Sequence, residues 1–238
     1  MSVVQKHEAA TVTPLVAGQR LDRATFHDRY EQMPPGTRAE LVGGVVYMPS
    51  PLRFDHGDRD HWVSVWLDRY MEFTQGIAVS HNASTFLDDE GEPQPDVLLR
   101  ILPEWGGRIR HVDGYLEGPP DLVIEIARSS RKFDLGPKYL DYERAGVSEY
   151  VVVGLEPDEA YWHVRRDERF VRVSPDTDGL FRSVVFPGLW LDAQALFDEN
   201  RGRLREIVDR GVATPEHAAF VARMAEARKG HSEGGTSP

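Results

Sequence analysis

The sequence has no cysteine among its 238 residues. This absence excludes disulfide bonds, cysteine-ligated zinc, iron–sulfur clusters and thiol nucleophiles. It fits a reducing compartment, so we expect a cytoplasmic protein. A chain of this length buries about 70% of its unfolded surface, which allows a stable core without metal or disulfide cross-links.

The sequence also lacks long apolar runs. No window reaches the roughly 18 consecutive apolar residues that a membrane-spanning helix needs. The N-terminal segment MSVVQKHEAATVTPL has no charged stretch followed by an apolar run, so it is a poor secretory signal. We therefore expect no membrane partner. With 40% hydrophobic residues, the chain is too apolar to be largely disordered.

Positive charge is scarce, and lysine is scarcer still. The chain has 28 Lys+Arg against 39 Asp+Glu, a formal net charge of −11. That balance argues against a protein that simply coats nucleic acid, because such proteins are usually basic. Only four of the cations are lysines: Lys6, Lys132, Lys138 and Lys229. A GC-rich genome explains this excess of arginine without any function, but it also means that each lysine departs from the usual choice of cation in this chain.

Several strong catalytic motifs are missing as well. The sequence has no GxxxxGK[ST] phosphate loop, no GxGxxG after a predicted strand, no GxSxG elbow and no HExxH. His56 and His61 are five residues apart, which places them on different faces of a helix and makes a two-histidine metal site there improbable.

Hydrophobic periodicity predicts alternating helices and strands. We expect helices over 21–33, 55–73, 135–145, 191–200 and 203–229, the last with a break near Thr214-Pro215. We expect strands over 38–51 (a strand pair or one bent strand around Gly43-Gly44), 77–87, 95–102, 121–127 and 149–155, then an antiparallel meander of 160–165, 169–174 and 180–187. Residues 103–120 are predicted to be a long loop, and Pro137 to lie in the first turn of its helix. We divide the chain into a flexible arm (1–17), one compact domain (18–200) and a helical, partly disordered tail (201–238).

One carboxylate stands inside an apolar strand. Glu125 interrupts the run Leu122 to Ala127, where alternation places it on the sheet face opposite Ile124 and Ile126. An ionised carboxylate buried there is costly unless it is paired or bound to a metal. Two interpretations stay open: a glutamate satisfied by an arginine or by backbone N–H groups, or a metal ligand.

Lys138 follows Glu125 by thirteen residues, on the next predicted helix. An i,i+4 pair with Asp134 explains a lysine at this position without any function. The alternative is a catalytic lysine, because a compact ammonium suits the polarisation of a scissile phosphate or a water molecule.

The segment from Glu40 to Val153 resembles the Uma2 family (DUF820), a branch of the PD-(D/E)xK nucleases with a restriction-endonuclease-like fold. The segments that carry the resemblance are AELVGGVVYMPSP (39–51), His56, QPDV (94–97), PPDLVIEIA (119–127), FDLGPKYLDY (133–142) and GVSEYVVV (146–153). The resemblance implies an α/β fold, in which helices flank a central mixed sheet and the site lies along its middle strands.

Site residues follow from the same resemblance. Asp96 and Glu125 match the two acidic positions of the motif, and Glu40 looks like the additional acidic residue. Ala127 occupies the usual lysine position, so the resemblance points to Lys138 as the displaced lysine. His56 and Asp134 match positions with supporting roles, and Tyr142 is expected to pack or to support.

These residue types suit phosphodiester hydrolysis. Glu40, Asp96 and Glu125 are expected to hold Mg²⁺ (or Mn²⁺), which prefers oxygen ligands, while Lys138 orients water or stabilises charge. We therefore expect a metal-dependent DNA endonuclease. Two alternatives stay open. One is a non-catalytic member of the fold that binds nucleic acid or protein. The other is a hydrolase of small phosphate esters, because an acidic surface would repel a small substrate less than a polyanionic duplex.

The sequence leaves substrate contacts and assembly open. Loop 103–118 carries Trp105, Arg108, Arg110 and His111, which suit either a nucleic acid backbone or a cover for the sheet edge. The basic tail (Arg201, Arg203, Arg205, Arg210) fits a substrate contact or an ordinary exposed helix face. A homodimer is compatible with cutting both strands of a duplex.

Overall fold

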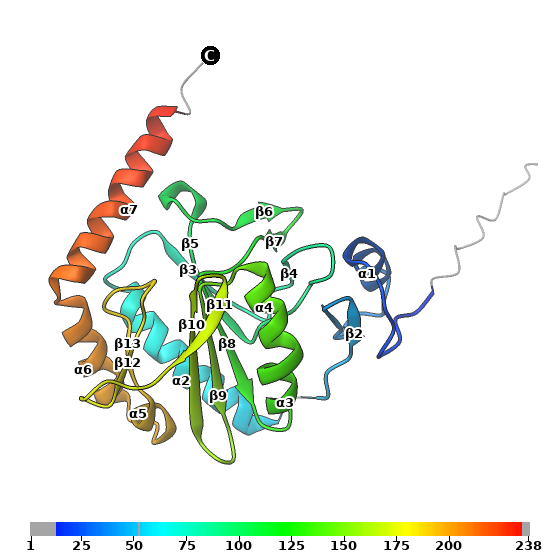
Figure 1. Ribbon diagram of the computed structural model, residues 1–238, viewed down its shortest axis with the longest axis horizontal. Helices are drawn as coiled ribbons and strands as arrows, with labels where there is room; N and C mark the ends of the chain where they lie inside the picture. Colours follow the sequence, from blue (N-terminus) through cyan, green and yellow to red (C-terminus); the bar gives the residue numbers. More distant parts are fainter. Residues whose placement is uncertain (1–12, 52, 235–238) are drawn as a thin grey trace, which may run out of the picture.

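The computed structural model describes residues 13–51 and 53–234 (Figure 1). At its centre lies a six-stranded sheet in the order β11-β10-β9-β8-β5-β3. Its strands are β3 (Ile77–His81), β5 (Val97–Ile101), β8 (Leu122–Ala127), β9 (Glu149–Gly154), β10 (Glu159–Arg166) and β11 (Arg169–Val173). β8 and β9 pair in parallel, and the other neighbours pair antiparallel. The mixed sheet that the resemblance implies is therefore confirmed.

Helices cover both faces of this sheet (Figure 1). The main core lies between the sheet and α2 (Phe54–Met71), α5 (Ala193–Phe197), α6 (Arg201–Val212) and α7 (Pro215–Gly234). The opposite face is covered by a continuous helical segment made of α3 (Arg131–Phe133), the π-helical turn η2 (Asp134–Lys138) and α4 (Tyr139–Ala145). This segment is the crossover that joins the parallel strands β8 and β9, as parallel pairing requires.

The middle strand β8 is buried on both faces, which explains its nearly continuous apolar run. Ile124 and Ile126 belong to the main core with Trp66 of α2, whereas Val123 belongs to the second core with Tyr142 of α4. The predicted alternation is thus confirmed, and it turns the side chain of Glu125 toward the crossover segment.

The N-terminal part forms a small unit with its own apolar cluster. It comprises α1 (Arg23–Tyr30), β1 (Glu40–Val42) and β2 (Val45–Tyr47). Gly43 and Gly44 have φ angles of 57° and 71°, which the two-residue turn between β1 and β2 requires. Leu41 and Glu92 exchange backbone hydrogen bonds of 3.1 and 2.8 Å. This pairing holds the hairpin against the central body and fixes the position of Glu40.

The single strand predicted over 77–87 is wrong, because the chain turns at Asn82 (φ 49°). β3 ends before this turn, and β4 (Thr85–Phe86) joins a different sheet with β6 (Arg110–Val112) and β7 (Tyr115–Glu117). The loop predicted over 103–120 is consequently wrong too, because it contains η1 (Pro103–Trp105) and both of these strands. Asp113 and Gly114, both at positive φ, make the hairpin turn that joins them.

The predicted meander is correct for β10 and β11 only. The next strand, β12 (Leu180–Arg182), pairs with β13 (Trp190–Asp192) and not with β11. The helix predicted over 191–200 is shorter for this reason. Asp192 ends β13 and caps α5, accepting a hydrogen bond from the Ala195 N–H at 3.1 Å.

Pro137 does not lie in a first helical turn as predicted, because the helical segment already begins at Arg131 and Pro137 lies within η2. The predicted break near Pro215 is confirmed, since α6 ends at Val212 and α7 begins at Pro215. Leu204 and Phe220 of these helices join the main core. The division at residues 17 and 200 stays a prediction, and the ends 1–12 and 235–238 lie outside the described residues. No helix within the described ranges is long and apolar enough to cross a membrane.

Glu149 gives this fold a pH-dependent stability. It is fully buried at the start of β9 and accepts hydrogen bonds from the Val185 N–H at 3.0 Å and the Trp162 indole N–H at 3.1 Å. Burial nevertheless raises its pKa from 4.5 to about 7. As the pH rises from 4.5 to about 7, the unfolded chain releases this proton while the folded protein keeps it. The free energy of unfolding should therefore fall over this pH range by on the order of 3 kcal/mol.

Urea unfolding of wild type and Glu149→Gln at pH 5 and pH 8 checks this. The amide does not titrate, so the variant should gain stability relative to wild type as the pH rises. A difference between the two proteins that is the same at both pH values would contradict the assignment.

Candidate active site

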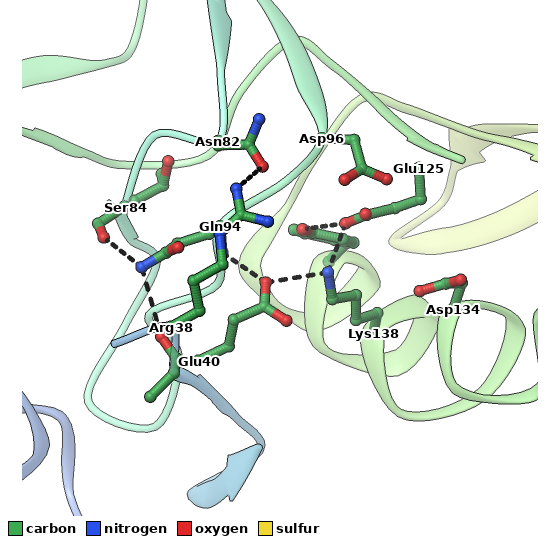
Figure 2. Close-up of polar contacts among 12 residues, drawn as sticks. Arg38, Glu40, Asn82, Ser84, Gln94, Asp96, Glu125, Asp134 and Lys138 are labelled. Carbon is green, nitrogen blue, oxygen red and sulfur yellow. Dashed lines mark hydrogen bonds and ion pairs between the residues drawn. The ribbon is translucent and has the colours of Figure 1, made fainter. Parts of the chain in front are cut away.

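A pocket of about 450 Å³ opens where β5 begins and β8 ends. Its walls come from the N-terminal hairpin, the start of α2, the two strands and the crossover segment. It is lined by all six side chains predicted from the sequence: Glu40, His56, Asp96, Glu125, Asp134 and Lys138. Figure 2 shows five of them, without His56, gathered around one centre. The structure therefore brings the predicted residues together, while their roles stay predictions.

Glu125 meets a lysine and a tyrosine. Its Oε1 accepts hydrogen bonds from the Lys138 ammonium at 2.9 Å and the Tyr142 hydroxyl at 2.8 Å. The side chain is only 3% exposed. Burial raises the pKa of Glu125 well above its ordinary value, although the positive charge of Lys138 acts in the opposite direction.

Lys138 bridges two carboxylates. Its Nζ lies 3.0 Å from Oε1 of Glu40 and 2.9 Å from Oε1 of Glu125. Burial alone would lower the pKa of Lys138, but the two carboxylates outweigh burial and raise it well above its ordinary value, so the ammonium stays charged. Among the ion pairs of the described residues, none joins Lys138 to Asp134, so the simple i,i+4 explanation of this lysine is wrong.

The local backbone explains how Lys138 reaches inward. It ends the π-helical turn η2, where Pro137 supplies no N–H donor to an ordinary helical ladder. Such turns are rare in proteins overall, but those that occur are often found at functional sites. The turn leaves both Asp134 and Lys138 buried on the pocket side of the crossover segment.

Asp96 lies across from Glu125. The antiparallel register pairs Val97 with Ile124. Asp96 is one residue before Val97 and Glu125 one residue after Ile124, so the two carboxylates lie opposite each other on the same face. Oδ2 of Asp96 accepts a hydrogen bond from the Ile126 N–H at 2.7 Å and lies 3.2 Å from His56 Nε2. Burial acts to raise the pKa of Asp96, but His56, Lys138 and the Ile126 N–H together lower it. The pKa of His56 is raised, because Asp96 outweighs the opposing effect of burial.

Glu40 and Asp134 are further acidic residues of the lining. Oε1 of Glu40 accepts a hydrogen bond from the Gln94 N–H at 2.7 Å, which ties the hairpin to the segment before β5. Asp134 is 3% exposed, and within the described chain its buried Oδ2 has no hydrogen-bond partner. Burial raises the pKa of Asp134 to about 6.

Sequence reasoning missed other residues of the pocket. Arg38 and Arg53 lie at its rim, and Tyr47 and Phe133 form part of its wall. Three of the four are next to, or within, segments already singled out, and Tyr47 and Phe133 are half-buried aromatics that no core claims. Nothing in the sequence of either segment sets these two aromatic residues apart, so no local signal could have found them.

The donor set fits a magnesium ion held by few ligands. The pocket offers several carboxylate oxygens, the ligand type that Mg²⁺ prefers, and Asp134 Oδ2 is a buried oxygen that lacks a partner in the described chain. No group of three or more His, Asp or Glu in the described residues is already gathered as a metal-binding set. Mg²⁺ is commonly held by one or two carboxylates together with water and substrate phosphate, so the pair Asp96 and Glu125 suffices for such a site.

Comparisons with known proteins identify the family and support the fold. The model of the family Uma2, described as putative restriction endonuclease, matches residues 26–194. Among solved structures, the chain is similar to the crystal structure of a putative nuclease belonging to DUF820 from Anabaena variabilis ATCC 29413. The two share 17% sequence identity with a TM-score of 0.53, over 72% of this chain and 96% of that chain. At this identity the similarity supports the fold. No curated protein matches the chain.

Proposed function

Because the chain belongs to the Uma2 family of putative restriction endonucleases, we propose that it is a divalent-metal-dependent endonuclease that hydrolyses phosphodiester bonds of DNA. The convergence of Asp96, Glu125 and Lys138 from three separate elements carries this proposal. Five carboxylates line the pocket; Asp55 pairs with Arg128, and the other four (Glu40, Asp96, Glu125 and Asp134) lie around Lys138 and His56. Such a surplus of buried negative charge costs stability, and a retained cost of this kind is typical of a functional site.

Each residue has a proposed task. Asp96 and Glu125 hold Mg²⁺ or Mn²⁺, with Glu40 as the predicted third ligand. A bound divalent ion lowers the pKa of a coordinated water and offsets negative charge on the phosphate. Lys138, whose ammonium stays charged, orients the attacking water or stabilises the developing charge.

His56 is proposed as a positioning residue. It lies 3.2 Å from one oxygen of Asp96, which the Ile126 N–H also contacts. These two contacts fix the carboxylate and leave its second oxygen without a protein partner among the described residues. Supporting contacts of this kind orient metal ligands and affect affinity.

DNA is proposed as the substrate despite the net charge of −11. That charge argues against broad electrostatic capture of DNA, so we propose that the phosphates meet local arginines instead. Arg38 and Arg53 are exposed at the rim of the pocket, which supports this substrate class. For cutting both strands, we propose a homodimer.

Metal-dependent nicking tests the proposal. Wild type should convert supercoiled plasmid to nicked circles with Mg²⁺ or Mn²⁺, and a chelator should abolish the conversion. In calorimetric titrations, Glu125→Gln should weaken metal binding by at least about 10-fold. Glu149→Gln, which changes a buried strand carboxylate outside the pocket, is the matched control and should bind metal as wild type does.

Two outcomes would refute the proposal in different ways. If wild type neither binds metal nor nicks plasmid, the nuclease proposal fails, and the non-catalytic alternative that binds nucleic acid or protein is favoured. The modest size of the pocket and the acidic chain favour a second candidate, a hydrolase of small phosphodiesters. Hydrolysis of bis(p-nitrophenyl) phosphate without any action on DNA would support that candidate.

A further inference from the structure

One side of the pocket is an aromatic and apolar wall. Tyr47 from the end of β2 and Phe133 from α3 lie with ring centroids 4.2 Å apart, tilted by 43°. Met48, Pro49 and Pro51 extend this wall. Within the described chain, neither ring belongs to any of the three buried apolar clusters. The rings therefore line the pocket without being needed to fill a core.

The ionic groups lie at the inner end of the same pocket. The side chains of Lys138 and Glu40 are 5% and 7% exposed, and that of Glu125 is 3% exposed. A phosphate can reach them only by entering the pocket. A volume of about 450 Å³ is of the size that holds one small ligand, such as a nucleotide, and is too small for a duplex.

Two arginines at the rim of the pocket are placed to contact the phosphates of a DNA strand. Arg38 donates a hydrogen bond to Oδ1 of Asn82 at 2.9 Å, and Arg53 is exposed next to the start of α2. Among the described residues, neither forms an ion pair, whereas Arg128 in the same pocket pairs with Asp55 and Glu156. Two guanidinium groups at the mouth, neither paired with a carboxylate among the described residues, suit the phosphates that flank a nucleotide held inside.

From this arrangement we infer that the pocket binds a single unpaired nucleotide, with its base stacked on the wall of Tyr47 and Phe133 and its phosphate toward Lys138. The inference rests on the proposed nuclease function and specifies the substrate class: single-stranded DNA or DNA with an unpaired position. A base on an aromatic ring gains stacking energy whatever its identity, so the wall predicts little sequence preference. In a fully paired duplex, the nucleotide must first leave the stack, which costs a few kcal/mol.

Fluorescence of 2-aminopurine in short oligonucleotides tests this subsite without requiring cleavage. With Ca²⁺ present, wild type should quench 2-aminopurine in a single strand, or opposite an abasic position, and bind these DNAs at least about 10-fold more tightly than the paired duplex. Tyr47→Ala should weaken binding to the single strand by about 5-fold or more, the low end of one lost stacking contact. Tyr47→Trp should restore binding, since it keeps an aromatic surface.

Phe73→Ala is the matched control, because Phe73 is an exposed phenylalanine beyond the far end of α2. It should leave quenching and affinity unchanged. Equal binding and equal cleavage of paired and unpaired DNA by wild type would overturn the inference while leaving the nuclease proposal intact. Quenching that depends on Tyr47, without metal-dependent cleavage of any DNA, would support the subsite and refute the nuclease instead. The comparison of paired with unpaired DNA needs only wild type, so it tests the inference even if a variant fails to fold.

Discussion

Replacing Lys138 with methionine should lower the free energy of unfolding by roughly 3–5 kcal/mol and abolish metal-dependent cleavage. Methionine fills a similar volume but leaves Glu40 and Glu125 buried without their shared cation. Removing one partner of a buried ion pair has about this cost, because the remaining charge is uncompensated. Thermal and urea unfolding measure the loss, which should lower the melting temperature by roughly 10 °C for a chain of this size.

The sign of its pH dependence gives a sharper check. Lys138 acts to lower the pKa of Glu125, so the variant should hold the proton on Glu125 to still higher pH. A raised folded-state pKa contributes stability that is lost as pH rises, so the deficit of Lys138→Met should be larger at pH 8 than at pH 5. The double variant Lys138→Met/Glu125→Gln should recover part of the loss.

Lys132→Met is the control, because Lys132 is an exposed lysine in the same helical segment and does not line the pocket. It should change neither stability nor cleavage. An unaltered melting temperature in Lys138→Met at both pH values would mean that Glu40 and Glu125 do not depend on Lys138 for charge compensation.

The strands and helices around the site could be predicted from the sequence because their patterns are local. The alternation of Leu122 to Ala127 sets Glu125 apart from Ile124 and Ile126 before any partner is known. The paired glycines 43 and 44 likewise determine the turn that brings Glu40 to the sheet. Which strands pair with each other could not be predicted in the same way. β12 pairs with β13, and neither the length nor the composition of the loop between them indicates this partner.

The site was predictable in its membership and not in its contacts. Sequence spacing suggested Asp134 as the partner of Lys138. In the structure, the π-helical turn and the position of the N-terminal hairpin instead direct this lysine toward Glu40 and Glu125. Partners 98 and 13 residues away along the chain leave no local periodic signal. The wall of Tyr47 and Phe133 was missed for the same reason, because each aromatic residue is unremarkable within its own segment.

Asp96→Asn should reduce metal-dependent cleavage by roughly 1,000-fold while leaving the fold nearly as stable as wild type. The asparagine carbonyl can still accept the hydrogen bond from the Ile126 N–H, which joins β5 to β8 at 2.7 Å. The amide removes the negative charge that faces a metal ion and that pairs with His56. Loss of one such group in a reacting centre typically costs 100- to 1,000-fold in rate, and here the ligand and its pairing with His56 are lost together.

The chain itself offers the control for this prediction. Asp121 also follows a proline, lies before β8, and accepts a hydrogen bond from the Ile101 N–H of β5 at 2.8 Å. It is thus the counterpart of Asp96 at the other end of the same strand pair, and it does not line the pocket. Asp121→Asn should therefore match Asp96→Asn in its small effect on the melting temperature and retain full cleavage. If the two variants lost activity equally, the aspartates would serve only to join the strands; if only Asp96→Asn lost it, the loss belongs to the pocket.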